Sequence, residues 1–123
     1  MRLRLARTIE IESLGVRNVN EYWSGVTELD GADAEEHWFA VEPEVSIRVM
    51  IWKPKGRGEP SNGTIVMVPG WGSMFEGWRP LVSEWVKTRH LVYIETREKA
   101  SSRIGRKISK SDFSIERHSK DIA

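Results

Sequence analysis

The loop of residues 69–73 is the part of the sequence best suited to bind an anion. It reads Pro-Gly-Trp-Gly-Ser and directly follows a short apolar run, residues 64–68. Ligands of open α/β sheets bind outside the carboxyl ends of the strands, and glycines let backbone N–H groups approach an anion without a Cβ atom in the way. Gly70 and Gly72 are therefore candidate substrate-binding residues. The alternative is a tight turn in which the glycines adopt positive φ values and Trp71 covers the end of the sheet.

Side chains that could act as nucleophile, base or metal ligand are few. Ser73 has no base close to it in the sequence, and capping the next helix is its favoured role. The three histidines, His37, His90 and His118, lack the spacing of a metal-ligand pair. The motif Gly-x-Ser-x-Gly, which places a nucleophilic serine at a strand-to-helix elbow, is absent. We therefore expect neither a metal nor another cofactor, and no complete catalytic triad.

Charge and composition favour a cytoplasmic protein with no nucleic-acid or membrane partner. Lys and Arg total 19 against 18 Asp and Glu, which gives a formal net charge of +1 and no field to steer polyanions. No apolar run approaches the roughly 18 residues that indicate a membrane span, and cysteine is absent. The basic stretch of residues 97–110 has no interleaved aromatic residues, which favours a solvated loop over a phosphate site. Its cations are Arg97, Lys99, Arg103, Arg106, Lys107 and Lys110.

The N-terminal part of the chain has the pattern of antiparallel strands. Apolar residues alternate with polar ones over residues 3–11, which predicts a half-buried strand. A turn-rich stretch follows, and residues 30–36 are acidic and loop-like. Residues 37–41 and 45–53 then predict a β-hairpin. The Gly- and Pro-rich residues 54–63 predict a surface connection.

The C-terminal part has the pattern of an α/β layer. The β-branched run of residues 64–68 predicts a strand covered on both faces, and residues 91–94 predict a second buried strand. Between them, apolar residues recur at helical spacing, with Pro80 expected in the first turn. Strand, helix and strand form a βαβ unit. A second helix is expected over residues 113–123, capped by Ser114 or Asp112. The stripe of the first helix comprises Trp78, Leu81, Val82, Trp85 and Val86.

This α/β layer carries a family resemblance. The segments Gly63-Thr-Ile-Val-Met-Val-Pro-Gly-Trp-Gly-Ser73, Trp78-Arg-Pro-Leu81 and Val92-Tyr-Ile-Glu95 resemble the third strand, first helix and fourth strand of α/β-hydrolases of the esterase- and lipase-like kind. Pro69 stands where that family often has His. The resemblance covers about residue 45 to the end of the chain.

Two further segments extend the resemblance. The family often follows its fourth strand with Asp-x-Arg-Gly-x-Gly-x-Ser, and residues 95–102 keep an acidic residue, the Arg and the Ser. Glu98 and Ala100 replace the two glycines, so a different loop shape is expected here. Residues 113–122 resemble the helix that leads into the family's nucleophile strand.

The resemblance implies a fold, a site and an activity. The fold class is α/β, with N-terminal antiparallel strands (residues 1–44) leading into the N-terminal half of an α/β-hydrolase-like domain (residues 45–123). The backbone N–H of Trp71 is the implied oxyanion-hole donor. The implied activity of the parent protein is hydrolysis of an ester or related acyl bond in a small-molecule substrate. The nucleophile and the rest of the triad would lie beyond Ala123, so this chain alone is expected to be inactive.

Two other functions remain open. The sequence Gly70-Trp-Gly72 after a strand, with Glu95 at the end of the next strand, imitates part of a dinucleotide-binding fingerprint, but residue 75 is Phe where that motif has Gly. A non-catalytic, partner-binding protein is the second alternative. In the resembled family the nucleophile strand pairs beside the strand equivalent to Thr64–Val68, so an exposed edge there could associate with a partner.

Overall fold

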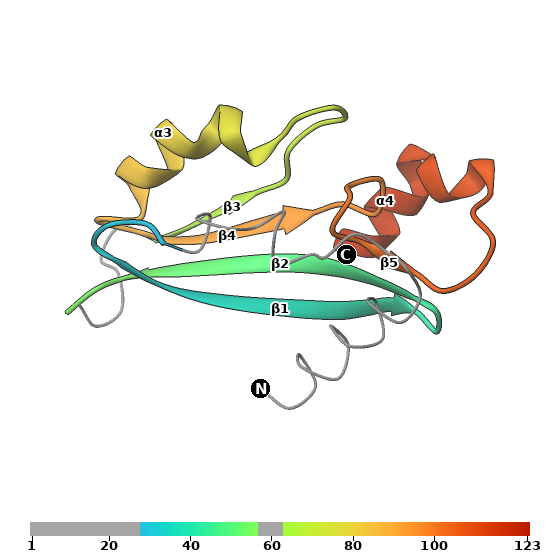
Figure 1. The fold of residues 1–123 in the computed structure, drawn as a ribbon, viewed down its shortest axis with the longest axis horizontal. Helices are drawn as coiled ribbons and strands as arrows, with labels where there is room; N and C mark the ends of the chain where they lie inside the picture. Colours follow the sequence, from blue (N-terminus) through green and yellow to red (C-terminus); the bar gives the residue numbers. More distant parts are fainter. Residues whose placement is uncertain (1–27, 57–62) are drawn as a thin grey trace.

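The computed structural model describes residues 28–56 and 63–123, which form a mixed β-sheet with helices (Figure 1). The expected strand over residues 3–11 and the turn-rich stretch after it lie outside the described residues. The elements, in chain order, are β1 (Ala32–Glu42), β2 (Val45–Pro54), β3 (Thr64–Met67), α3 (Phe75–Trp85), β4 (His90–Glu95), β5 (Arg103–Ile104), the 3-10 helix η1 (Lys110–Phe113) and α4 (Ile115–Ile122).

The sheet is mixed, because it combines an antiparallel hairpin with a parallel pair of strands. Together with the helices, it confirms the predicted α/β class. Its strands lie in the order β1-β2-β4-β3, and β5 pairs with the beginning of β2. β2 is antiparallel to β1 and to β4, whereas β3 is parallel to β4. In the described part of the chain β3 therefore has β4 on one side and a free edge on the other. The expected division of the chain into residues 1–44 and 45–123 falls between β1 and β2, the two strands of the hairpin. This division stays a prediction.

The hydrophobic core lies between the sheet and α3. Trp52 stacks on Phe75 with ring centroids 5.7 Å apart, and Tyr93 meets the edge of Phe75 at 5.2 Å. From the helix, Val82 and Val86 are fully buried against these aromatic residues. Such burial supplies most of the stability of a small domain. The predicted helix is thus confirmed.

Three details of the predicted helix are wrong. Pro80 lies in the second turn and not the first, because the helix already begins at Phe75, whose ring is buried in the core. Leu81 is 40% exposed, so the buried stripe is narrower than expected. Ser73 does not cap the helix either. Met74 occupies the N-cap position, and no side chain accepts a hydrogen bond there.

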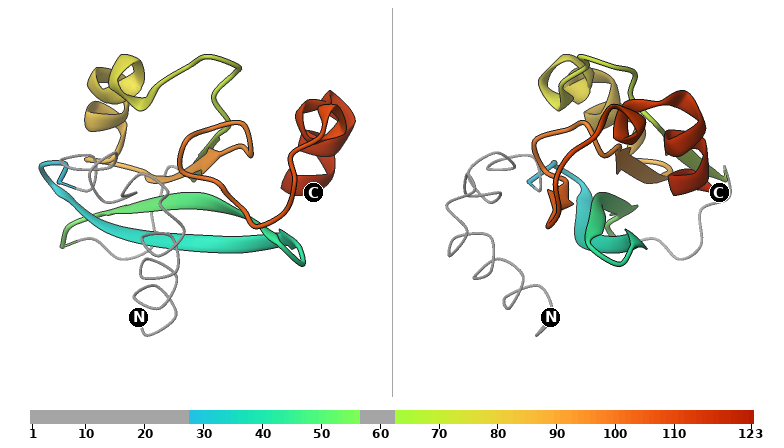
Figure 2. Two further views of the ribbon diagram at one scale, coloured as in Figure 1. Left: turned by 45° about the vertical axis from the view of Figure 1, so that its right-hand side comes forward. Right: turned by 90° about the vertical axis from the view of Figure 1, so that its right-hand side faces the viewer.

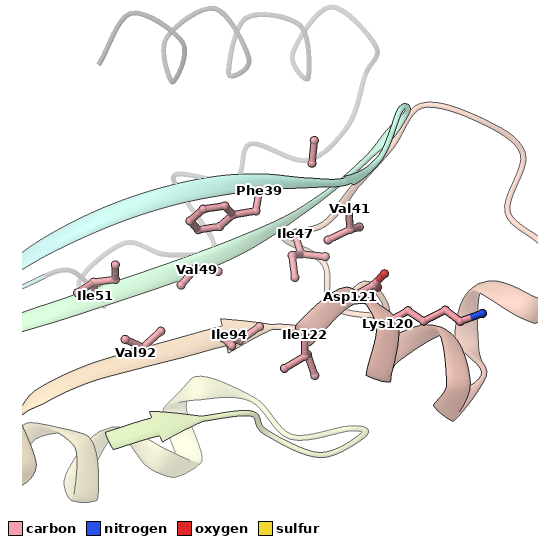
Figure 3. A pocket seen from close by; sticks show the side chains of 11 residues that line it. Phe39, Val41, Ile47, Val49, Ile51, Val92, Ile94, Lys120, Asp121 and Ile122 are labelled. Carbon is pink, nitrogen blue, oxygen red and sulfur yellow. The ribbon is translucent and has the colours of Figure 1, made fainter. Parts of the chain in front are cut away.

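The sheet face opposite α3 is apolar and unevenly covered, since Ile47 and Val49 are buried whereas Phe39 is 52% exposed. An open groove of about 520 Å³ runs between this face and the C-terminal turn of α4 (Figure 3). Val66 is 61% exposed and Val68 is also exposed, so the prediction that residues 64–68 are covered on both faces is wrong. Among the described helices, α3 packs on one face of the sheet, and the C-terminal turn of α4 lies at the groove on the other. The groove is lined chiefly by Phe39, Val41, Ile47, Val49, Ile51, Val92, Ile94 and Ile122.

The first strand is longer and the last helix shorter than predicted. Residues 30–36 were expected to form a loop, but β1 begins at Ala32 and pairs with β2 as far as Pro54. The acidic side chains are accommodated in two ways. Glu35 is exposed and accepts a hydrogen bond of 2.9 Å from Lys53 Nζ, whereas the buried Glu36 side chain forms an ion pair with Arg48. The predicted Ser114 cap of α4 is confirmed, since its hydroxyl accepts from the Arg117 N–H. None of the described helices is long and apolar enough to cross a membrane.

Candidate functional site

The loop between β3 and α3, called the Gly-Trp-Gly loop below (residues 69–73), reaches toward η1 and α4 (Figure 2). Trp71 is 65% exposed, and its ring lies edge-on to Phe113 at 6.0 Å and beside His118 at 6.1 Å. Gly72 has a φ of 71°, as the turn interpretation predicted. The loop is closed by a 3.1 Å hydrogen bond from the Ser73 N–H to the Gly70 carbonyl. Trp71 is thus a largely exposed residue whose ring packs against Phe113 and His118.

The underside of the loop is held by a buried lysine. Lys99 is 8% exposed, and its Nζ donates to the Gly70 carbonyl at 2.7 Å and to the Ser73 carbonyl at 3.0 Å. Hydrogen bonds from a charged donor are stronger than neutral ones. Lys99 follows the next strand of the sheet, so one side chain connects the loops after β3 and β4. The prediction of a solvated loop is wrong for this residue.

The upper side of the loop offers free donors. The Trp71 and Gly72 N–H groups donate to no carbonyl or side chain among residues 28–56 and 63–123. A Cβ atom added to Gly72 would meet nothing within 4 Å, which is consistent with an open approach to the backbone. Two adjacent N–H groups on an open glycine-containing turn can bind an anion.

A buried carboxylate lies at the end of β4. Glu95 is 1% exposed, and neither oxygen has a hydrogen-bond partner in the described part of the chain. Burial raises the pKa of Glu95 to about 7, and the positive charges of Lys99 and Arg48 oppose this rise. A carboxyl group with such a pKa near a loop is a candidate for function, although structural charges can also shift pKa values. Arg48 forms an ion pair with Glu36 on β1.

A histidine and a glutamate lie beside Trp71. His118 Nε2 is 3.3 Å from Glu98 Oε2, and the Thr96 hydroxyl donates to Glu98 Oε1 at 2.7 Å. The position of Glu98 is one at which the resembled motif has glycine. Its side chain instead contacts α4, so the departure from the motif adds an interaction. Nothing in the sequence pattern indicated that His118 would reach this site.

A buried arginine fixes the surrounding elements. Arg97 has no exposed side-chain surface; it binds Asp121 of α4 through two hydrogen bonds of 2.6 and 2.7 Å, and also Asp112 and Glu42 at 2.8 Å. Asp121 and the other carboxylates raise the pKa of Arg97 above its ordinary value. One guanidinium group thus joins β1, η1 and α4 to the end of β4. We call Arg97 and these three carboxylates the arginine cluster.

Arg106 completes the arginine cluster from the basic stretch. It donates to both oxygens of Asp112, at 2.6 and 2.9 Å, and to Glu42 at 3.1 Å. Together with the Ser109 N–H and Arg97, Arg106 holds the pKa of Asp112 well below its usual range. Arg97, Lys99 and Arg106 are therefore structural cations, and the solvated-loop prediction is wrong for all three. Lys107 and Lys110 are exposed, as expected.

Comparison with known proteins gave one structural similarity. No protein-family model and no curated protein matches the chain. Among solved structures, a novel thermostable esterase from Pseudomonas putida aligns with 56% of this chain and 23% of its own, at 18% identity and a TM-score of 0.43.

The conformation of Gly72 can be tested by comparing two glycines. We expect Gly72→Ala to lower the free energy of unfolding by about 1 kcal/mol, because an L-residue is strained at positive φ. Gly77→Ala, inside α3 where a Cβ meets nothing within 4 Å, should raise it by about 0.5–1 kcal/mol. Urea denaturation measures both. Equal effects of the two substitutions would contradict the assigned loop conformation.

Proposed function

We propose that this chain belongs to an α/β-hydrolase-like enzyme that cleaves an ester or a related acyl bond, and that the Gly-Trp-Gly loop supplies part of its oxyanion hole. The observation that carries the proposal is the pair of free N–H groups at Trp71 and Gly72. They lie just beyond the carboxyl end of a parallel strand, where α/β sheets bind ligands. The turn that presents them is closed by its own hydrogen bond and anchored from below by Lys99.

The proposed chemistry is stabilisation of a tetrahedral intermediate. When a nucleophile attacks an acyl carbonyl, the carbonyl oxygen becomes negatively charged, and N–H donors placed about 3 Å from it lower the barrier. In the resembled family one donor is the equivalent of the Trp71 N–H and the second follows the nucleophile. Removing one such donor typically raises the barrier by about 3–4 kcal/mol. The exposed apolar surfaces of Trp71 and Met74 could contact the acyl chain.

The nucleophile must come from a segment other than the described residues. The sequence has no Gly-x-Ser-x-Gly motif, and in the resembled family the strand bearing it pairs beside the equivalent of β3. The free edge of β3 and the exposure of Val66 and Val68 support pairing at this position. For the same reason we propose that the 123-residue chain has no triad-dependent turnover of its own.

Butyrate is a suitable probe, because its carboxylate resembles an acyl group that carries negative charge. Titrated into the ¹⁵N-labelled chain, it should produce saturable amide shifts at Trp71 and Gly72. Trp71→Pro, which deletes the backbone donor, should abolish the response at Gly72, whereas Trp71→Phe, which keeps the N–H, should retain it. Unchanged amide shifts in β2 and β4 serve as the control for folding. Shifts spread evenly over exposed lysines, or none at all, would contradict the proposal.

A non-catalytic, partner-binding role is the second candidate, and the free edge of β3 together with the apolar groove supports it. Concentration-dependent self-association that Val66→Lys abolishes, with no response to butyrate, would favour this role. The dinucleotide alternative gains no support. Phe75, at the position where that motif needs a glycine, is buried against Trp52 and Tyr93.

A further inference from the structure

The Gly70–Trp71 peptide group links Lys99 to the candidate oxyanion donor. None of the described peptide bonds is cis. In a trans peptide the carbonyl and the N–H of the same planar group point in opposite directions. The Gly70 carbonyl and the Trp71 N–H belong to one such group, so the orientation of the first determines that of the second.

Lys99 holds this carbonyl in one orientation. The Lys99 Nζ is itself held in place, because it also donates to the Ser73 carbonyl at 3.0 Å and lies 3.5 Å from Glu98 Oε1. Lys99 is buried, whereas the Trp71 ring is largely exposed. With the Gly70 carbonyl held by Lys99 at 2.7 Å and by the Ser73 N–H at 3.1 Å, the Trp71 N–H points away from the Lys99 ammonium group.

We propose that Lys99 is the positioning residue of the oxyanion site, since by holding the Gly70 carbonyl it aims the Trp71 N–H at the place where the oxyanion develops. This inference rests on the proposed function for the identity of the ligand, but the orientation itself can be measured without any ligand. Lys99 touches no substrate and has no role in proton transfer. Without it, the Gly70 carbonyl would be held only by the 3.1 Å hydrogen bond from the Ser73 N–H, and a glycine on each side of Trp71 would make rotation of the peptide group easier.

The test measures the orientation of the N–H bond directly. In the weakly aligned 123-residue chain, the ¹⁵N–¹H residual dipolar coupling of Trp71 should fit the alignment of the sheet. In Lys99→Met, which keeps the length of the side chain but removes its donors, we expect this coupling to fall toward zero while those of β2 and β4 are retained. The amide exchange of Ser73 should rise by about tenfold or more, because its turn loses a charged hydrogen bond.

Two further variants keep the test decisive. The double variant Glu95→Gln with Lys99→Met removes the buried carboxylate that would otherwise lose a neighbouring cation, and it is used if Lys99→Met alone unfolds. Lys87→Met, an exposed lysine at the end of α3, is the matched control and should leave Trp71 unchanged. An unchanged Trp71 coupling in the folded Lys99 variants would overturn the positioning role. A lost coupling in a chain that never responds to butyrate would support the positioning role and count against the proposed function.

Discussion

Replacement of Arg97 by Met is expected to lower the free energy of unfolding by about 3–5 kcal/mol, the usual effect of removing one partner from a buried ion pair. The substitution would leave Asp121 almost fully buried and Glu42 partly buried without their main cation, and the buried Asp112 would keep only Arg106. The carboxylates left around the former guanidinium would repel one another, and a buried charge without its partner is costly. Urea denaturation at neutral pH measures the loss.

Arg97→Lys and Lys87→Met serve as the comparisons for this result. A lysine keeps the charge but cannot form the paired bonds with Asp121, so its effect should be intermediate. Lys87 forms an exposed ion pair with Glu84, and its loss should change stability by less than about 1 kcal/mol. If Arg97→Met were as harmless as Lys87→Met, the arginine cluster could not be what joins β1 and α4.

Glu95 is expected to make the protein less stable as the pH rises from about 4.5 to 7. Its ordinary pKa is 4.5, and burial raises its pKa to about 7 in the folded chain. Between these values the folded state holds a proton that the unfolded state has released, so each rise in pH favours unfolding. The loss over this interval amounts to about 3 kcal/mol. Glu95→Gln, which stays neutral, should show none of it.

The comparison of wild type with Glu95→Gln by urea denaturation at pH 5, 6, 7 and 8 tests this expectation. The variant should be close to wild type at pH 5 and clearly more stable at pH 8. Glu84→Gln, an exposed residue of α3, is the control and should follow the wild type throughout. Parallel curves for wild type and Glu95→Gln would show that Glu95 is ionised, or exposed, in the folded chain.

The arginine cluster acts at lower pH and with the opposite sign. Arg97 holds the pKa of Glu42 below its ordinary value of 4.5. Arg106 holds the pKa of Asp112 below its ordinary value of 3.8. The stability from these groups is present above the unfolded-state pKa values and is lost as the pH falls below them. The combined contribution of Glu42, Glu95 and Asp112 to stability is therefore expected to be greatest near pH 5.

Local pattern was sufficient to predict most of the elements. The alternation over β2, the β-branched run of β3 and the apolar stripe of α3 each reflect how one element presents its side chains to a core. The turn chemistry of Gly72 and the cap at Ser114 are also local, because they depend on a few neighbouring residues. The segment from Asp30 to Glu36 was mispredicted for the opposite reason. Its strand exists because β2 lies beside it, and the sequence of one strand does not reveal its partner.

The candidate site could be predicted only in part. The sequence by itself determined the Gly-Trp-Gly loop after a strand, and with it the candidate donor at Trp71. Only the tertiary structure decided what lies around it: Lys99 beneath the loop, His118 beside Trp71, and Glu95 buried without a partner. From the sequence, Lys99 was assigned to a solvated basic stretch and His118 to a helix. Whether a charged residue is solvated or buried depends on which distant groups the fold brings within hydrogen-bonding distance, and that is decided by the packing of the sheet and α4.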